Sequence, residues 1–221
     1  MERMPRLWEA KFLHYTTGRS GSTFISQILK DVLGIENVWA GHDPVAFPFH
    51  KGEKLVITYR DFRDVAASYW RINNDIQDHV LNSGARKMSP KDVNHYSNMI
   101  AGLVRGHMNP TYKAHPGALL MKYEDFFPDN YGYIFERIEK HFDIKLSSGR
   151  RVEIKKKYSL ERNKQRAAKF SSFKQVDREY VHGLHIYKGD IGTWKNLVPA
   201  NQHAVMNKIL RPFLEEWGYR V

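Results

Sequence analysis

The feature that most constrains the fold is a glycine-rich loop set between an apolar segment and an amphipathic one. The loop "TTGRSGST" covers residues 16–23. It follows the apolar "KFLHY" and precedes "FISQILKDVLG", in which apolar residues recur at helical spacing up to Gly34. A strand, a tight glycine turn and a helix in this order are typical of a parallel sheet covered by helices. Glycines also let successive backbone N–H groups converge on an anion at a helix N-terminus, so the loop is a candidate anion site.

The rest of the chain repeats this alternation of strand-like and helix-like segments. Strands are predicted at 11–17, 36–42, 54–60 and 117–126, the last ending in acidic residues. Helices are predicted at 22–34, 64–74, 99–108, 130–142 and 201–219. The sequence therefore predicts an α/β fold in a single domain over residues 1–221, with a central parallel sheet flanked by helices. In such a sheet, ligands bind at the carboxyl ends of the strands.

Composition excludes several classes of protein. The chain contains no cysteine, which excludes a disulfide framework, a thiolate metal site and a thiol nucleophile. It shows no apolar run of the length that a signal peptide or a membrane span needs. We therefore expect a cytoplasmic protein with no membrane partner.

The net charge of +11 is concentrated in one segment. Residues 150–174 hold ten Lys or Arg and two Glu, and so account for 8 of the 11 net positive charges. Such a run is most often a solvated helical face, but a clustered excess also suits an anionic partner.

The glycine loop lacks the lysine of an ATP- or GTP-binding loop. In the pattern GxxxxGK[ST] that lysine follows the last glycine, where this chain has Ser22. The cation comes earlier, at Arg19. Ser20, Ser22 and Thr23 supply further donors. A purely structural strand-to-helix turn remains the alternative for this loop taken alone.

Two further constellations carry basic residues beside turns. "YRDFRDVAASYW" places Arg60 at the end of a predicted strand and Ser68 two helical turns later. "IYKGDIGTWKN" places Lys188 and Lys195 around glycines 189 and 192. The alternatives are a surface ion pair between Arg60 and Asp64 for the first, and an ordinary turn for the second.

Taken in order along the chain, these motifs resemble those of the sulfotransferase family. "TTGRSGST" is similar to the family's loop for the 5′-phosphosulfate of 3′-phosphoadenosine 5′-phosphosulfate (PAPS). "YRDFRDVAASYW" is similar to its 3′-phosphate motif. "MKYEDF" resembles the family's strand end, and "KGDIGTWKN" its C-terminal glycine loop. The resemblance implies a P-loop-like sulfotransferase domain over the whole chain, with PAPS as co-substrate and no metal. The product is then the desulfated nucleotide, adenosine 3′,5′-bisphosphate (PAP).

The resemblance also implies roles for individual residues. Catalytic roles fall on His42 as base, Arg19 as the cation at the leaving group and Lys195 as a second cation. Cofactor-binding roles fall on Arg19, Ser20, Gly21, Ser22, Thr23, Phe24, Arg60, Ser68, Tyr123, Ser159, Leu160, Lys188 and Gly189. Among these, Phe24, Tyr123, Ser159 and Leu160 are expected beside the nucleoside. The basic segment 150–174 would be a flexible lid over the cofactor.

The sequence constrains the catalytic base, the acceptor and the oligomeric state less than it constrains the cofactor site. His50 is the alternative to His42, which directly follows a predicted strand. The acceptor implied is a small molecule or a carbohydrate with a hydroxyl or amine. The usual cytosolic dimer motif keeps only Lys195, so we expect a monomer or another kind of dimer.

The sequence features also leave two alternative classes of function. A nucleotide-dependent phosphotransferase would require the missing lysine. A basic nucleic-acid-binding module would leave the glycine-bearing anion sites without a purpose, and we expect no nucleic acid partner. The pair "HGLH" at 182–185 could suggest a metal, but it has no carboxylate or thiolate partner nearby in the sequence, so we expect a structural role.

Overall fold

The computed structural model describes residues 10–41, 54–74, 76, 83–84, 86–177, 181–183, 186 and 189–221. Contacts divide the chain into two compact units, each built from two stretches of sequence. The first unit comprises Met1–Tyr59 and Met108–Asn163, and the second comprises Arg60–His107 and Lys164–Val221. The expectation of one sulfotransferase domain over residues 1–221 stays a prediction.

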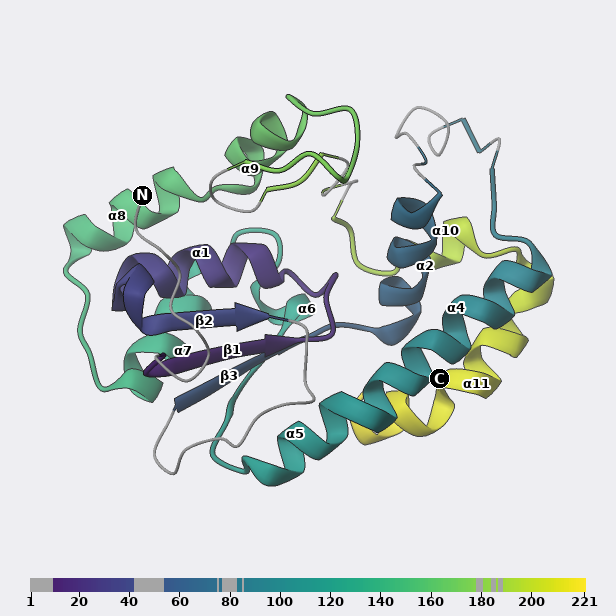
Figure 1. Ribbon diagram of the computed structural model, residues 1–221, viewed down its shortest axis with the longest axis horizontal. Coiled ribbons are helices and arrows are strands. Elements are labelled where there is room, and N and C mark those ends of the chain that lie inside the picture. The colour runs from purple at the N-terminus through teal and green to yellow at the C-terminus, as the bar shows by residue number, and fades with distance from the viewer. Residues whose placement is uncertain are drawn as a thin grey trace. The chain divides into compact units, whose positions relative to one another are not determined.

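The first unit contains a parallel four-stranded sheet. Its strands are β1 (Phe12–Thr16), β2 (Val38–Gly41), β3 (Lys54–Tyr59) and β4 (Leu119–Lys122), in the order β2-β1-β3-β4. Figure 1 shows β2, β1 and β3 running side by side, with α1 (Ser22–Leu33) along them. The register pairs Tyr15 with Gly41 and Thr16 with Thr58, so β1, β2 and β3 end near one edge.

This strand order places a switch point beside the glycine loop. The chain leaves β1 through α1 to β2 on one side, and then returns to β3 on the other side of β1. In open parallel sheets the connections therefore diverge between the two central strands, and ligands bind at their carboxyl ends. The loop after β1 lies at this position.

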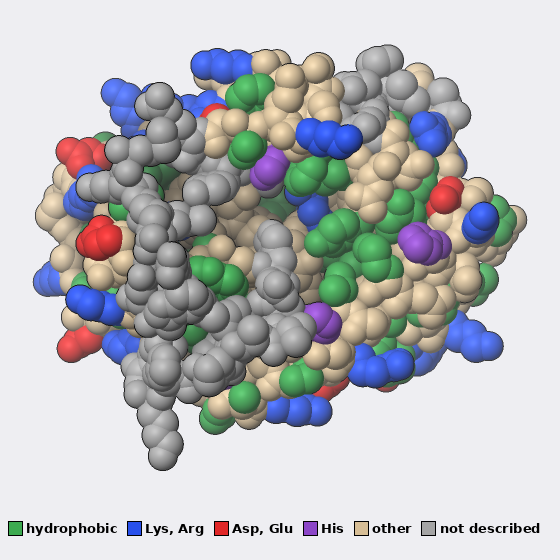
Figure 2. Space-filling view, in the orientation of Figure 1, with side chains coloured by type: hydrophobic (Ala, Val, Ile, Leu, Met, Phe, Trp, Pro, Cys, Tyr) green, Lys and Arg blue, Asp and Glu red, His purple; other side chains and the backbone are tan. Residues whose placement is uncertain are grey.

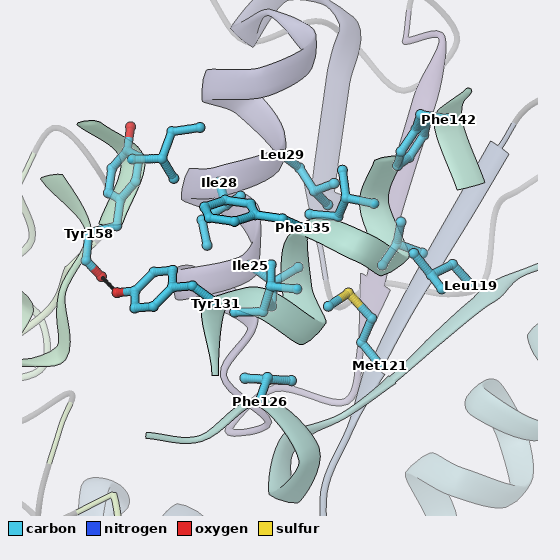
Figure 3. Packing of buried hydrophobic residues seen from close by; sticks show 14 of the residues in the cluster. Ile25, Ile28, Leu29, Leu119, Met121, Phe126, Tyr131, Phe135, Phe142 and Tyr158 are labelled. Atoms are coloured by element: carbon cyan, nitrogen blue, oxygen red, sulfur yellow. Dashed lines mark hydrogen bonds between the residues drawn. The ribbon is translucent and has the colours of Figure 1, made fainter. Parts of the chain in front are cut away.

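The core of the first unit forms between α1 and the elements that follow β4. Ile25, Ile28 and Leu29 project from α1 toward Met121 of β4 and Phe135 of α7 (Tyr131–Phe142), as Figure 3 shows. The hydroxyl of Tyr131 donates to the backbone oxygen of Tyr158 over 3.1 Å. This bond ties α7 to the end of α8 (Ser148–Lys157).

The regular elements described in the second unit are helices, apart from an isolated β-bridge between Val176 and His182. Its main helices are α2 (Phe62–Asn73), α4 (Pro90–Leu103), α10 (Trp194–Leu197) and α11 (His203–Glu216). Helix α4 packs against α2 and α11, and the pair α4 and α11 is visible in Figure 1. Buried apolar side chains fill the space between them: Phe62, Val65, Trp70, Val93, Ile100, Met206, Leu210 and Leu214.

The α/β fold class is confirmed, but three predicted segments differ. The strand predicted at 117–126 ends at Lys122, and its acidic part forms a helical turn, α6 (Tyr123–Phe126). The short helix predicted at 99–108 is the end of α4 followed by a π-helical stretch, Val104–Met108, and then α5 (Asn109–Ala114). The last helix begins at His203 after a 3₁₀ turn, and continues through Pro212.

Within the described part of the chain, none of the helices combines the length and the apolar character of a membrane span.

Candidate functional site

The glycine loop turns through three residues with left-handed backbone. Gly18, Arg19 and Gly21 have φ of 77°, 58° and 75°. At Gly21 a Cβ atom would lie 2.9 Å from ring atoms of Tyr123 and Phe126, so a side chain has no room there. Gly21 is also the N-cap of α1, where glycine has no side-chain oxygen to occupy the helix's first N–H groups. This arrangement suits an anion.

Buried hydroxyl groups support the loop from the sheet side. The hydroxyl of Ser20 is fully buried and lies 2.6 Å from Thr16 Oγ1 and 3.2 Å from Thr58 Oγ1. Thr16 Oγ1 accepts from the backbone N–H of Gly18 over 3.0 Å. His14, also fully buried, continues the chain of hydrogen bonds, with Nε2 3.1 Å from Thr58 Oγ1. The Ser20 hydroxyl is thus hydrogen-bonded inside the protein. The predicted contact of Ser20 with the cofactor would therefore have to be made by its backbone N–H, and it stays a prediction.

Removing the Ser20 hydroxyl should therefore destabilise the fold. In Ser20→Ala the buried hydroxyls of Thr16 and Thr58 lose a partner, and we expect about 1–3 kcal/mol less free energy of unfolding. The exposed Ser148 provides a control, because Ser148→Ala should change that free energy by less than about 0.5 kcal/mol. Urea unfolding measures both, and equal values for the two variants would contradict the support role.

The second predicted anion site centres on a buried ion pair. Arg60 directly follows β3 and is 8% exposed. Its Nη2 donates to Asp64 Oδ2 over 3.1 Å and to the backbone oxygen of Asp190 over 2.7 Å. The pair is buried, so the alternative of a surface ion pair is wrong. Ser68 lies one turn beyond Asp64 in α2, on the same face of the helix.

The C-terminal glycine loop adjoins the predicted 3′-phosphate motif. Gly189 and Gly192 both have positive φ, 78° and 76°. The backbone N–H of Gly192 donates to Asp64 Oδ2 over 2.8 Å. Lys195 is exposed on α10. Lys188 lies outside the described residues, as do His42 and His50. The structure thus brings the predicted 3′-phosphate motif and the C-terminal glycine loop together.

The residues predicted beside the nucleoside occupy different surroundings. Tyr123 stacks on Phe127, with ring centroids 4.9 Å apart, and its ring borders Gly21. The half-buried Phe24 packs its ring edge against Tyr131 at 5.7 Å, next to the core of the first unit. Ser159 caps the start of α9 (Leu160–Ala167) by accepting from the backbone N–H of Arg162. The structure thus brings Tyr123 against the glycine loop, and the roles of Ser159 and Leu160 stay predictions.

Part of the basic segment is held by ion pairs. Asp31 of α1 accepts from Arg150, from Lys157 over 2.6 Å and from Tyr158 over 2.8 Å. Burial by itself would raise the pKa of Asp31, but these hydrogen bonds and the two cations hold that pKa below its usual value. Arg151 pairs with Glu139 over 2.6 Å. Ser148–Lys157 thus form a regular helix bonded to its neighbours, while the lid expected for residues 150–174 stays a prediction. Figure 2 shows Lys and Arg side chains dispersed on the face in view.

The described residues contain no group of three His, Asp or Glu side chains arranged to hold a metal ion. His182, from the pair "HGLH", bonds through Nδ1 to the backbone oxygen of Phe173 and stacks on that ring at 4.4 Å. His182 therefore has structural contacts, while His185 lies outside the described residues.

Two residues whose hydrogen bonds support these loops, Asp64 and His14, were not among the predicted site residues. Asp64 was considered only as the partner of Arg60 in a possible surface ion pair. The four-residue spacing from Arg60 was the available signal for Asp64. A histidine inside an otherwise apolar strand was the signal for His14.

A parallel sheet with an arginine-bearing glycine loop at its switch point defines a P-loop-like α/β protein. A model of the family described as "Sulfotransferase domain" matches residues 49–218, which is more than half of the chain. The chain therefore belongs to the sulfotransferase family. The match begins after the glycine loop and includes the other three motifs.

A solved structure agrees with this assignment at the level of the fold. The crystal structure of mouse sulfotransferase SULT7A1 complexed with PAP has a TM-score of 0.61 and 14% sequence identity, covering 96% of this chain and 85% of that one. At this identity the likeness concerns the fold. A comparison with curated protein sequences found no match. The resemblance to the PAPS-dependent sulfotransferase family is confirmed, and the chain is an enzyme of this family.

Proposed function

We propose that this enzyme transfers the sulfuryl group of PAPS to a hydroxyl or amine of a small-molecule or carbohydrate acceptor. The observation that carries the proposal is the buried Arg60–Asp64 pair in the 3′-phosphate motif, to which the C-terminal glycine loop is bonded through Gly192. A phosphate at this point would explain why an arginine is buried and oriented at the end of a strand. PAP in the mouse structure is the corresponding bisphosphate.

The reaction follows from the charges involved. The acceptor oxygen or nitrogen attacks sulfur, the bond from sulfur to the 5′-phosphate oxygen breaks, and PAP leaves with the bonding electrons. The acceptor's proton passes to a base, for which we propose His42. Because a sulfuryl group bears less negative charge than a phosphoryl group, side-chain cations suffice for its transfer without a metal. Arg19 would stabilise the charge that develops on the leaving phosphate, with Ser22 and Thr23 as further donors and Lys195 as a second cation.

The rival functions have less support. The residue after Gly21 is serine, so this chain lacks the phosphate-binding lysine of a metal–nucleotide phosphotransferase. A nucleic-acid module would use the basic segment, but Arg150, Arg151 and Lys157 are engaged with Asp31 and Glu139. We further propose a cytoplasmic enzyme that is a monomer or a dimer of another type than the usual cytosolic one.

Calorimetry on Arg60 variants tests the proposal. Hydrogen bonds to charged groups contribute about 1.5–3 kcal/mol. Arg60→Ala should therefore bind adenosine 3′,5′-bisphosphate about tenfold or more weakly, and the 5′-monophosphate almost unchanged. Arg211→Ala, on the exposed side of α11, is the matched control and should alter neither affinity.

Removing a buried arginine can affect folding, so a second variant is needed. Ser68 is half-buried, and Ser68→Ala should show the same selective loss to a smaller extent. Equal losses for both nucleotides in the two variants would refute the 3′-phosphate assignment.

A further inference from the structure

A single carboxylate connects Arg60 to a segment about 130 residues later in the chain. The side chain of Asp64 is 1% exposed. Its Oδ2 accepts from Arg60 Nη2 over 3.1 Å and from the backbone N–H of Gly192 over 2.8 Å. Its Oδ1 accepts from the backbone N–H of Trp194 over 2.9 Å. Both oxygens therefore accept hydrogen bonds, and together these bonds fix the orientation of the carboxylate plane.

The backbone oxygen of Asp190 completes the connection. It accepts from Arg60 Nη2 over 2.7 Å and from the hydroxyl of Thr193 over 2.6 Å. Arg60 is thereby bonded both to Asp64 of α2 and to Asp190 in the C-terminal glycine loop. The orientation of the guanidinium and the course of residues 190–194 depend on each other through Asp64.

The charges explain why the carboxylate is suited to this position. Burial raises the pKa of Asp64, while the cation of Arg60 and the two backbone N–H groups oppose that rise. Asparagine, a neutral side chain of the same size, would turn its N–H₂ donor toward at least one of the three N–H donors that now bond to Asp64, and no hydrogen bond could form there. The arrangement therefore requires an acceptor at both Asp64 oxygens.

Trp194 is also held from a second direction. The guanidinium of Arg63 lies 4.7 Å from the centre of the Trp194 ring, and it is itself paired with Asp61 over 2.7 Å. The start of α10 thus keeps one anchor when Asp64 is changed. Loss of the Asp64 bonds should disturb residues 190–193 and Arg60 more than the helix that follows.

We propose that Asp64 is a positioning residue that aims Arg60 and the loop 189–194 at the 3′-phosphate of the nucleotide. This inference rests on the proposed function, in which Arg60 and Gly189 bind that phosphate. It assigns to Asp64 the enzyme's discrimination between nucleotides with and without a 3′-phosphate. Asp64 itself repels the phosphate, so its contribution is to orientation.

The test compares affinities for two nucleotides in three proteins. Wild type, Asp64→Asn and the control Arg211→Ala, on the exposed side of α11, are titrated with adenosine 3′,5′-bisphosphate and with the 5′-monophosphate. In Asp64→Asn the preference for the bisphosphate should fall about tenfold or more, with monophosphate affinity almost unchanged. In turnover assays KM for PAPS should rise similarly, while kcat changes less than about threefold, since Arg19 is not touched. Arg211→Ala leaves Asp64 and its bonds intact and should change the preference by less than about threefold.

Each other outcome has a definite meaning. An equal loss for both nucleotides in Asp64→Asn, or an unchanged preference, overturns the inference while the proposed function stands. A wild type without preference for the bisphosphate overturns the proposed function and this inference with it. If Asp64→Asn does not fold, hydrogen exchange on the wild type decides: the amides of Gly192 and Trp194 should be protected without nucleotide, and fast exchange at both overturns the inference.

Discussion

Replacing Arg19 by glycine should lower kcat by about 10²–10³ without lowering the stability of the protein. Arg19 has a φ of 58°, a backbone conformation that glycine adopts more readily than arginine. The variant therefore removes the cation while the turn keeps its shape. Negative charge grows on the leaving phosphate as the bond to sulfur breaks, so loss of the cation should affect kcat more than the affinity for PAPS.

The comparison with Arg19→Lys sharpens this prediction. Lysine keeps the charge but loses the planar fork of donors, and so should recover part of the rate. Steady-state turnover at saturating PAPS, together with thermal unfolding of each variant, gives the required values. A kcat for Arg19→Gly within threefold of wild type would remove Arg19 from the transition state.

Replacing His42 by alanine should lower kcat by about 10²–10⁴ and leave the affinity for the nucleotide nearly intact. His42 directly follows Gly41, the last residue of β2, which pairs with Tyr15 near the end of β1. The strand predicted before His42 is thus present, and the preceding residue lies at the carboxyl edge of the sheet. His42 itself lies outside the described residues, so its role is a proposal from the sequence.

His50→Ala is the matched comparison. Normal turnover in His42→Ala with a loss in His50→Ala would transfer the role to His50. Normal turnover in both would indicate a carboxylate base. Nucleotide binding by calorimetry in the same variants separates a loss of the base from a loss of the cofactor.

Much of the fold could be predicted because its signals are local. The apolar runs at 12–16 and 54–59 and the helical spacing in 22–33 are properties of neighbouring residues, and each forms the expected element. The prediction was wrong at 123–126, where a strand was extended into a helical turn. Short tracts of aromatic and acidic residues carry no clear period, so their structure depends on what they pack against.

The chemical character of the molecule can be read along the chain: the positions of its glycine turns, the arginine in place of the loop lysine, and the order of motifs by which the family is recognised. The bonds of Ser20 to Thr16 and Thr58, and those of Asp64 to Gly192 and Trp194, become apparent in the folded structure alone. The reason is physical. Conformational preference and periodicity act between near neighbours, whereas the direction of a buried hydroxyl or carboxylate follows from donors and acceptors that folding brings from distant parts of the chain.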